Sequence, residues 1–128
     1  MKIIGHPWIE CERFVVVNSL EEIKKSPAGS VLLFGDLANS IVLLRYCRNE
    51  DLPFAVETGD VKSALFAHAL GARYILLENR LAKEIQALAQ HYLFDTEILV
   101  MIRDDHEIER YAKMGIDGVI FASSIQRL

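Results

Sequence analysis

The sequence lacks the features that mark secreted, membrane and redox proteins. Its two cysteines, Cys11 and Cys47, are too far apart for a CxxC pair or a disulfide framework. We therefore expect reduced thiols in a cytoplasmic protein. Neither cysteine has an identifiable basic partner, so neither is predicted to be a nucleophile. No apolar run approaches the roughly 20 residues of a membrane-spanning helix, and no signal-peptide layout follows Met1.

The sequence also lacks the motifs of nucleotide and nucleic-acid binding. Its net charge is -4 and it has no basic stretch that would follow a phosphate backbone, which argues against nucleic-acid partners. There is no Walker loop and no G-x-G-x-x-G; the turn 34–37 holds one glycine. We expect no resident metal and no cofactor.

Composition and length indicate one folded domain. Hydrophobic residues make up 52% of the 128 residues and charged residues 25%, which is a globular composition. We expect a single α/β domain over 1–128, in which residues 1–13 form an edge strand or an arm. Strands that are buried on both faces account for the high apolar content.

Short β-branched runs alternate with helical stretches along the chain. Strands are predicted at Phe14–Asn18, Val31–Gly35, Phe54–Thr58, Tyr74–Glu78, Ile98–Arg103 and Gly118–Ala122, and helices near 20–26, 37–49, 60–70, 80–93 and 105–114. This succession favours right-handed crossovers and a parallel sheet.

Capping residues support these boundaries. Ser19 with Glu22 forms a capping-box pattern, and Asp36, Asp60, Asn79 and Asp104 or Asp105 each precede a helical stretch. Gly71 and Gly115 follow helices, at positions that favour a left-handed backbone.

Two similar segments within the sequence resemble a repeat of known folds. Residues 69–77 and 113–121 both end a helix, turn at glycine and enter an apolar strand. This pattern resembles the βα repeat of (βα)8 barrels and of flavodoxin-like sheets. Because the chain holds only five helix-containing units, a complete eight-unit barrel is excluded. We expect a flavodoxin-like three-layer α/β sandwich with a mostly parallel sheet of 5–6 strands.

Two of the predicted helices are apolar around most of their circumference. In 37–49 and 60–70 the apolar residues spread over more than one face, whereas 80–93 has a single apolar stripe. One hypothesis is that the extra faces contact a second copy of the chain. The alternative is that they pack under the N-terminal segment.

Polar residues follow the predicted strands, at the edge where open parallel sheets bind ligands. The candidate ligand-binding residues are Asp36, Glu57, Glu78, Asn79, Arg103, His106 and Ser123. In a flavodoxin-like order the strands that end in Asn18, Glu57, Glu78 and Arg103 are successive neighbours. Glu57 and Glu78 would then share a proton, bind a cation with Asp36, or be neutralised by Arg103. The alternative is that these side chains are helix caps and solvated acids.

The C-terminal segment 115–125 resembles the late strand-loop of phosphate-binding (βα)8 barrels. There a Gly-Ser pair offers N–H groups and a hydroxyl to a phosphate. Ser123 matches the serine of that pair, but Ala122 stands where glycine would be. The resemblance implies a phosphate contact at Ser123; the other interpretation is that Ser123 and Ser124 cap the tail.

Two functions are consistent with these observations. The first is a non-enzymatic module that binds a partner protein or self-associates through helices 37–49 and 60–70. The second is a binding protein or enzyme for a phosphorylated or carboxylated metabolite at the strand carboxyl ends. The sequence identifies no catalytic residue, and the fold class alone does not choose between the two.

Overall fold

A computed structural model describes residues 1–128. The strands are β1 (Lys2–Ile4), β2 (Phe14–Val16), β3 (Val31–Phe34), β4 (Phe54–Glu57), β5 (Tyr74–Leu77), β6 (Glu97–Ile102), β7 (Gly118–Phe121) and β8 (Gln126–Arg127). The helices are α1 (Leu20–Lys25), α2 (Ile41–Asn49), α3 (Val61–Ala69), α4 (Asn79–His91) and α5 (Ile108–Lys113), with 3₁₀ turns η1 (Asp105–Glu107) and η2 (Ala122–Ser124). None of these helices combines the length and the apolar character that a membrane span requires.

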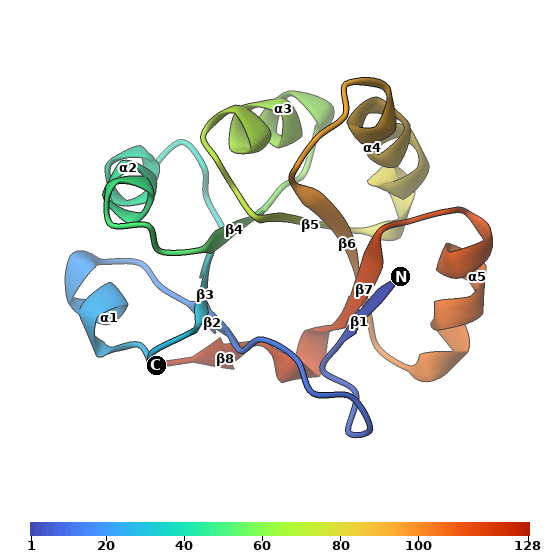
Figure 1. The fold of residues 1–128 in the computed structure, drawn as a ribbon, viewed down its shortest axis with the longest axis horizontal. Helices are drawn as coiled ribbons and strands as arrows, with labels where there is room; N and C mark the ends of the chain where they lie inside the picture. The colour runs from blue at the N-terminus through green and yellow to red at the C-terminus, as the bar shows by residue number, and fades with distance from the viewer.

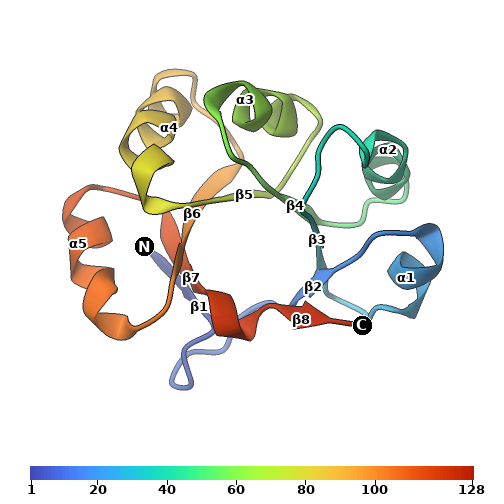
Figure 2. The same cartoon turned by 180° about the vertical axis from the view of Figure 1, so that it is seen from behind.

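All strands belong to one parallel sheet that curves into a ring. The order is β1-β7-β6-β5-β4-β3-β2-β8, and every pair of neighbours is parallel. Figures 1 and 2 show the strands around a central axis and the five helices outside them. From β2 to β7 each new strand is added on the same side of the one before. Because right-handed crossovers that always step in one direction leave their helices on one face, the helices cover only the outside.

Two layers of apolar side chains hold the ring together. Alternate strand residues point to opposite faces, so Val31 and Leu33 of β3 belong to a cluster made only of strand side chains inside the ring. Leu32 and Phe34 belong to the larger cluster between the strands and the helices. The strands are therefore buried on both faces, as the apolar runs predict.

The expectation of an α/β fold with a parallel sheet flanked by helices is confirmed, but the sheet has eight strands rather than 5–6. The additional strands are β1 and β8, which are short and form the two edges. The order also lacks the reversal of a flavodoxin-like sheet, so a three-layer arrangement with helices on both faces does not form. As a result β3 separates the strand before Asn18 from β4, and Asn18 and Glu57 do not follow neighbouring strands.

The first and last segments of the chain meet between β1 and β8, the two edge strands of the sheet, which do not pair with each other. Gly5 has a φ of +96°, and a Cβ added there would collide with Ser124 of η2. Only glycine fits this backbone and this close approach, so it lets the N-terminal loop cross the C-terminal turn. The termini thereby bring β8 beside β2 and β1 beside β7.

Local capping follows the sequence expectations in most places. Ser19 accepts a hydrogen bond from the Glu22 backbone N–H, and Asp60 accepts one from that of Ser63. Gly71 and Gly115 have left-handed backbones, as predicted. Three predictions were wrong: Asn79 is the first residue of α4 rather than its cap, α2 begins at Ile41 rather than near 37, and the N-cap of α2 is therefore Ser40 rather than Asp36.

Candidate functional site at the carboxyl rim

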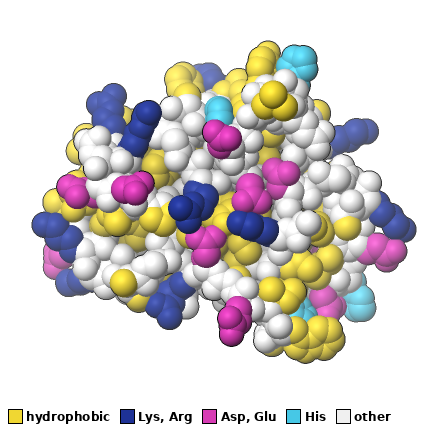
Figure 3. All heavy atoms as spheres, in the orientation of Figure 1, with side chains coloured by type: hydrophobic (Ala, Val, Ile, Leu, Met, Phe, Trp, Pro, Cys, Tyr) yellow, Lys and Arg dark blue, Asp and Glu magenta, His cyan; other side chains and the backbone are white.

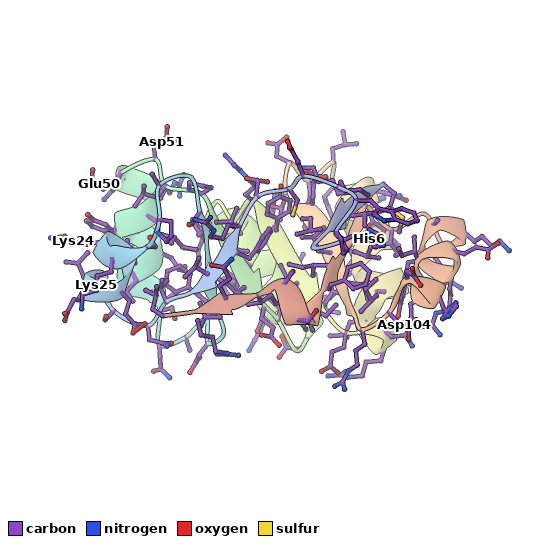
Figure 4. All side chains as sticks on the ribbon, turned by 90° about the horizontal axis from the view of Figure 1, so that it is seen from below. His6, Lys24, Lys25, Glu50, Asp51 and Asp104 are labelled. Atoms are coloured by element: carbon purple, nitrogen blue, oxygen red, sulfur yellow. The ribbon has the colours of Figure 1, made fainter.

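The ring has two rims, formed by the amino and the carboxyl ends of its parallel strands. Figure 1 views the amino ends and Figure 2 the carboxyl ends. In the edge-on view of Figure 4, Asp51 and Asp104 project at opposite rims. Asp51 precedes β4 and Asp104 follows β6, in agreement with this polarity. In parallel βα rings the carboxyl rim carries the binding sites, because the loops that vary between proteins gather there.

Three cavities meet at this rim. The α2–α3 cavity lies between those helices, with a volume of about 670 Å³. The β4–β5 cavity beside it measures about 310 Å³, and the mouth cavity over the inside of the ring about 350 Å³. Gly35 and Glu57 line all three, so the ends of β3 and β4 are the centre of the site.

The alternation of β4 explains the position of Glu57. Ala55 belongs to the cluster inside the ring and Val56 to the outer one, so Glu57 is again on the inner side. Its carboxylate forms no hydrogen bond or ion pair with another side chain, and the residue is exposed. Glu57 is therefore free to interact with a bound molecule.

Thr58, the next residue, turns to the outer side of the sheet and lines the α2–α3 and β4–β5 cavities. The residue is only 5% exposed, and its hydroxyl oxygen is the only buried side-chain N or O atom without a hydrogen-bond partner. An unpaired buried hydroxyl is costly and calls for an explanation, such as a molecule bound beside it.

Basic side chains around the rim are also without acidic partners. Arg45 and Lys62 line the α2–α3 cavity and Arg127 lines the mouth cavity, and none of them forms an ion pair. Arg80 is engaged, since it donates to the carbonyl of Gly59 at 3.0 Å and holds the loop between β4 and α3. Each of these three cations therefore lines a cavity that Glu57 also lines.

The helix cap beside the site is well formed. The pKa of Asp60 lies below its usual value because its carboxylate accepts the backbone N–H of Ser63, with further contributions from the Ser63 hydroxyl and nearby Lys62 and Arg80. Asp60 therefore stabilises the start of α3 and leaves Lys62 to face the cavity.

The structure brings together three of the residues that the sequence singled out. Asp36 lines the α2–α3 cavity, Glu57 lines all three cavities and Glu78 lines the β4–β5 cavity with Glu57. Asp36 is bound to the side chain of Asn39 in its own loop. These three form the acidic part of the rim.

The other four singled-out residues line none of the five principal cavities; they are Asn79, Arg103, His106 and Ser123. Asn79 begins α4, and His106 lies in η1, where only its backbone N–H is bound, by Asp104. The backbone N–H of Arg103 donates to Glu107, and the exposed Ser123 lies in η2.

The options proposed for Glu57 and Glu78 can be compared with this geometry. β4 and β5 are neighbours, so both residues end adjacent strands as expected. Arg103 pairs with neither of them, so neutralisation by Arg103 was wrong. No three His, Cys, Asp or Glu side chains gather closely enough to hold a metal ion, so Asp36 does not complete a cation site.

The amino rim is built differently. Lys2 pairs with Glu97 at 2.9 Å and donates to the Tyr74 hydroxyl at 2.7 Å. Tyr74 donates to Glu12, which also pairs with Arg73 at 2.9 Å. Figure 3, which shows this face, has basic and acidic side chains side by side over the centre of the ring.

Neither cysteine belongs to the carboxyl rim. Cys47 is a buried residue of α2, and burial raises the pKa of its thiol to about 11, so it is not a reactive thiolate at neutral pH. Cys11 is exposed in the N-terminal loop. Both thiols are free.

Several residues of the rim were not among the candidate ligand-binding residues predicted from the sequence. Arg45, Thr58, Lys62, Met101 and Arg127 line its cavities. A signal existed for Thr58, a polar residue at the end of an apolar strand directly before the Gly-Asp turn. Arg127 carried no signal, because only the tertiary fold brings the C-terminal tail beside β2.

No protein-family model matches the sequence, and a search of the curated proteins found no similar chain. The functional argument therefore rests on the geometry of the rim.

Proposed function

We propose that the protein binds a small metabolite with a phosphate or carboxylate group at the carboxyl rim. The observation that carries the proposal is the meeting of three cavities at Gly35 and Glu57. The α2–α3 cavity, at about 670 Å³, lies within the range of small-molecule sites. The unpaired cations Arg45 and Lys62 in that cavity favour a ligand that carries an anionic group.

A thermal-shift screen of the purified protein against phosphorylated and carboxylated metabolites tests this function. A ligand at a hundredfold excess over its Kd stabilises the folded state by about 2.7 kcal/mol, a shift of several degrees for a domain of this size. The shift is expected to shrink in Lys62→Gln. It should persist in Lys83→Gln, an exposed lysine of α4 that lines no principal cavity.

A screen without any hit would contradict the proposal. A hit that Lys62→Gln leaves unchanged would also contradict it, because the ligand would then bind elsewhere.

The second candidate is self-association through α2 and α3, or binding of a partner protein there. The observation in its favour is the exposure of apolar side chains on these helices: Val42 is 78% exposed, Phe66 56% and Leu65 40%. A contact with a second copy would cover them. Phe66 lines the α2–α3 cavity, so an interface that covers Phe66 would compete with a small ligand.

Light scattering over a range of protein concentrations distinguishes this candidate. A dimer is expected to dissociate in Val42→Asp and to persist in Leu93→Asp, where an 85% exposed leucine follows α4 instead. A monomer at every concentration, or equal effects of the two substitutions, would rule out self-association through these helices.

A further inference from the structure

The α2–α3 cavity has a polar end and an apolar end. Both helices begin at the carboxyl rim and run away from it (Figure 2). Lys62 and Ser63 lie in the first turn of α3, next to Thr58 and Glu57. Phe66 and Leu70 also line the cavity, one and two turns further from the rim.

Glu57 and Lys62 at the polar end, and Arg45 one turn along α2, provide charges of both signs that have no ion-pair partners. Glu57 forms no ion pair, and neither do Arg45 and Lys62, although all three line the same cavity. A ligand with only an anionic head would leave the carboxylate of Glu57 unpaired beside it. A ligand with only a cationic head would leave both cations unpaired. A head with one positive and one negative group satisfies both kinds of side chain.

The buried hydroxyl of Thr58 adds an uncharged hydrogen-bonding group at the same end. This hydroxyl has no hydrogen-bond partner in the free protein, and only 5% of the residue is exposed. A polar head seated beside β4 would supply the partner that this hydroxyl lacks once the Thr58 side chain rotates toward the cavity.

The apolar end suits a large hydrocarbon side chain. Phe66 and Leu70 line it from α3, and Phe66 is 56% exposed in the free protein, while Ile41, the first residue of α2, adds apolar surface nearer the rim. A hydrocarbon group between α2 and α3 would cover part of the Phe66 phenyl group. Binding would then be favoured by the removal of this apolar surface from water.

We propose that the α2–α3 cavity binds a zwitterionic α-amino acid with a large apolar side chain. Its carboxylate faces Lys62 and Arg45, its ammonium group faces Glu57, and its side chain lies along Phe66 and Leu70. This inference rests on the proposed function, since it names the class of ligand for the same rim. It explains together the free charges of both signs, the unpaired hydroxyl and the apolar half of the cavity.

Titration calorimetry with the full chain and four matched compounds tests the head and the side chain separately. L-phenylalanine carries all three features. 3-Phenylpropanoate lacks the ammonium group, phenethylamine lacks the carboxylate, and L-alanine lacks the apolar side chain. L-phenylalanine is expected to bind, and each of the others to bind about tenfold more weakly or worse, since each loses a charged hydrogen bond or the apolar contact.

Two substitutions assign the charges. Glu57→Gln is expected to weaken L-phenylalanine about tenfold and to leave 3-phenylpropanoate unweakened, because only the amino acid has an ammonium group. Lys62→Gln should weaken L-phenylalanine and leave phenethylamine unweakened. The matched controls are Glu50→Gln and Arg48→Gln. Both residues are exposed at the end of α2 and do not line this cavity. These two variants should bind L-phenylalanine as tightly as the wild type does.

The outcomes separate this inference from the proposed function. Equal affinity for L-phenylalanine and 3-phenylpropanoate, or an unchanged preference in Glu57→Gln, overturns the zwitterionic head. A phosphorylated or other carboxylated ligand that depends on Lys62, without binding of any apolar amino acid, overturns the inference and keeps the proposed function. No binding by any compound of either set overturns both.

Discussion

The two rims of the ring carry similar polar residues, but these residues are paired with one another at the amino rim and unpaired at the carboxyl rim. At the amino rim, Lys2, Glu12, Arg73 and Glu97 are paired with one another or with the hydroxyl of Tyr74. At the carboxyl rim, Glu57 and the nearby cations have no partners, and the hydroxyl of Thr58 is buried without one.

This difference suggests that the polar groups of the amino rim stabilise the fold and that those of the carboxyl rim are available to bind a ligand. A satisfied network contributes to folding and has little left to offer a ligand, whereas unpaired groups are available for a bound molecule. Parallel βα rings commonly divide their ends in this way, because the carboxyl-end loops are less constrained by the strands. The comparison predicts that substitutions at the amino rim lower stability and that those at the carboxyl rim do not.

The largest effect is expected from Tyr74→Phe at the amino rim. The hydroxyl donates to Glu12 and accepts from Lys2, and the side chain is fully buried. Its removal should lower the free energy of unfolding by about 1–3 kcal/mol. Urea unfolding followed by circular dichroism measures this, since the single tryptophan, Trp8, is already 90% exposed. Tyr92→Phe, on an exposed residue without a side-chain hydrogen bond, is the control; equal effects would contradict the comparison.

Two buried threonines test the unpaired hydroxyl. The Thr96 hydroxyl donates to the carbonyl of Ala72 at 2.7 Å and contacts Nδ1 of His68 at 3.0 Å. Thr96→Val should therefore destabilise by about 1–2 kcal/mol, whereas Thr58→Val should be neutral or stabilising by up to about 1 kcal/mol. Thermal unfolding of both variants measures the difference. A clear loss of stability in Thr58→Val would show that its hydroxyl is satisfied in solution.

Matched carboxylates give a smaller contrast. Glu12→Gln removes the charge that pairs with Arg73, and roughly 1 kcal/mol of stability is expected to be lost. Glu57→Gln should stay within about 0.5 kcal/mol of the wild type, because its carboxylate forms no hydrogen bond or ion pair with another side chain. Urea midpoints of the two variants decide this, and a larger loss in Glu57→Gln would reverse the assignment of the rims.

The smallest effect is expected from alkaline pH. Hydrogen bonds from Lys2 to Tyr74 and Glu97 raise the pKa of Lys2, and burial together with Glu12 raises the pKa of Tyr74. Both groups hold their protons more tightly when folded, so their stabilisation is complete below the usual values of 10.0 for tyrosine and 10.5 for lysine. It is lost as pH rises through the folded-state pKa values.

Urea unfolding between pH 8 and pH 11 measures this loss. The stability of the wild type should fall over the upper part of the range, and Tyr74→Phe should show a shallower fall because it removes the tyrosine's own contribution and the part of the Lys2 contribution that depends on Tyr74. Parallel curves for the two proteins would mean that this network does not set the alkaline limit.

Local sequence patterns predicted most of the elements but not their arrangement. All six predicted strands form, with ends within about two residues, because β-branched apolar runs bounded by turn residues are a local signal. The short edge strand β8 was missed, since two exposed residues, Gln126 and Arg127, carry no alternation. Strand order was also beyond local patterns, because the same βα repeat fits a reversing sheet and a ring that always steps one way.

For the candidate site, too, local sequence patterns predicted some features, and others depended on the tertiary arrangement. That Glu57 and Glu78 end adjacent strands followed from chain order, which holds in both arrangements. The placement of Arg103 and His106 away from the cavities depended on where the loop after β6 turns, which η1 and its cap Asp104 decide. Thr58 could be recognised as a polar strand end, but its missing partner is a property of packing alone.

The amino-acid sequence is sufficient to establish an α/β domain of parallel strands with polar side chains at their carboxyl ends, because periodicity, caps and turn residues act over a few neighbours. Only the tertiary structure places all helices on one side, closes the sheet with the two chain ends and pairs the charges at one rim but not at the other. Those features depend on contacts between residues far apart in the chain, such as Lys2 with Glu97 and Gly5 with Ser124, which no local pattern contains.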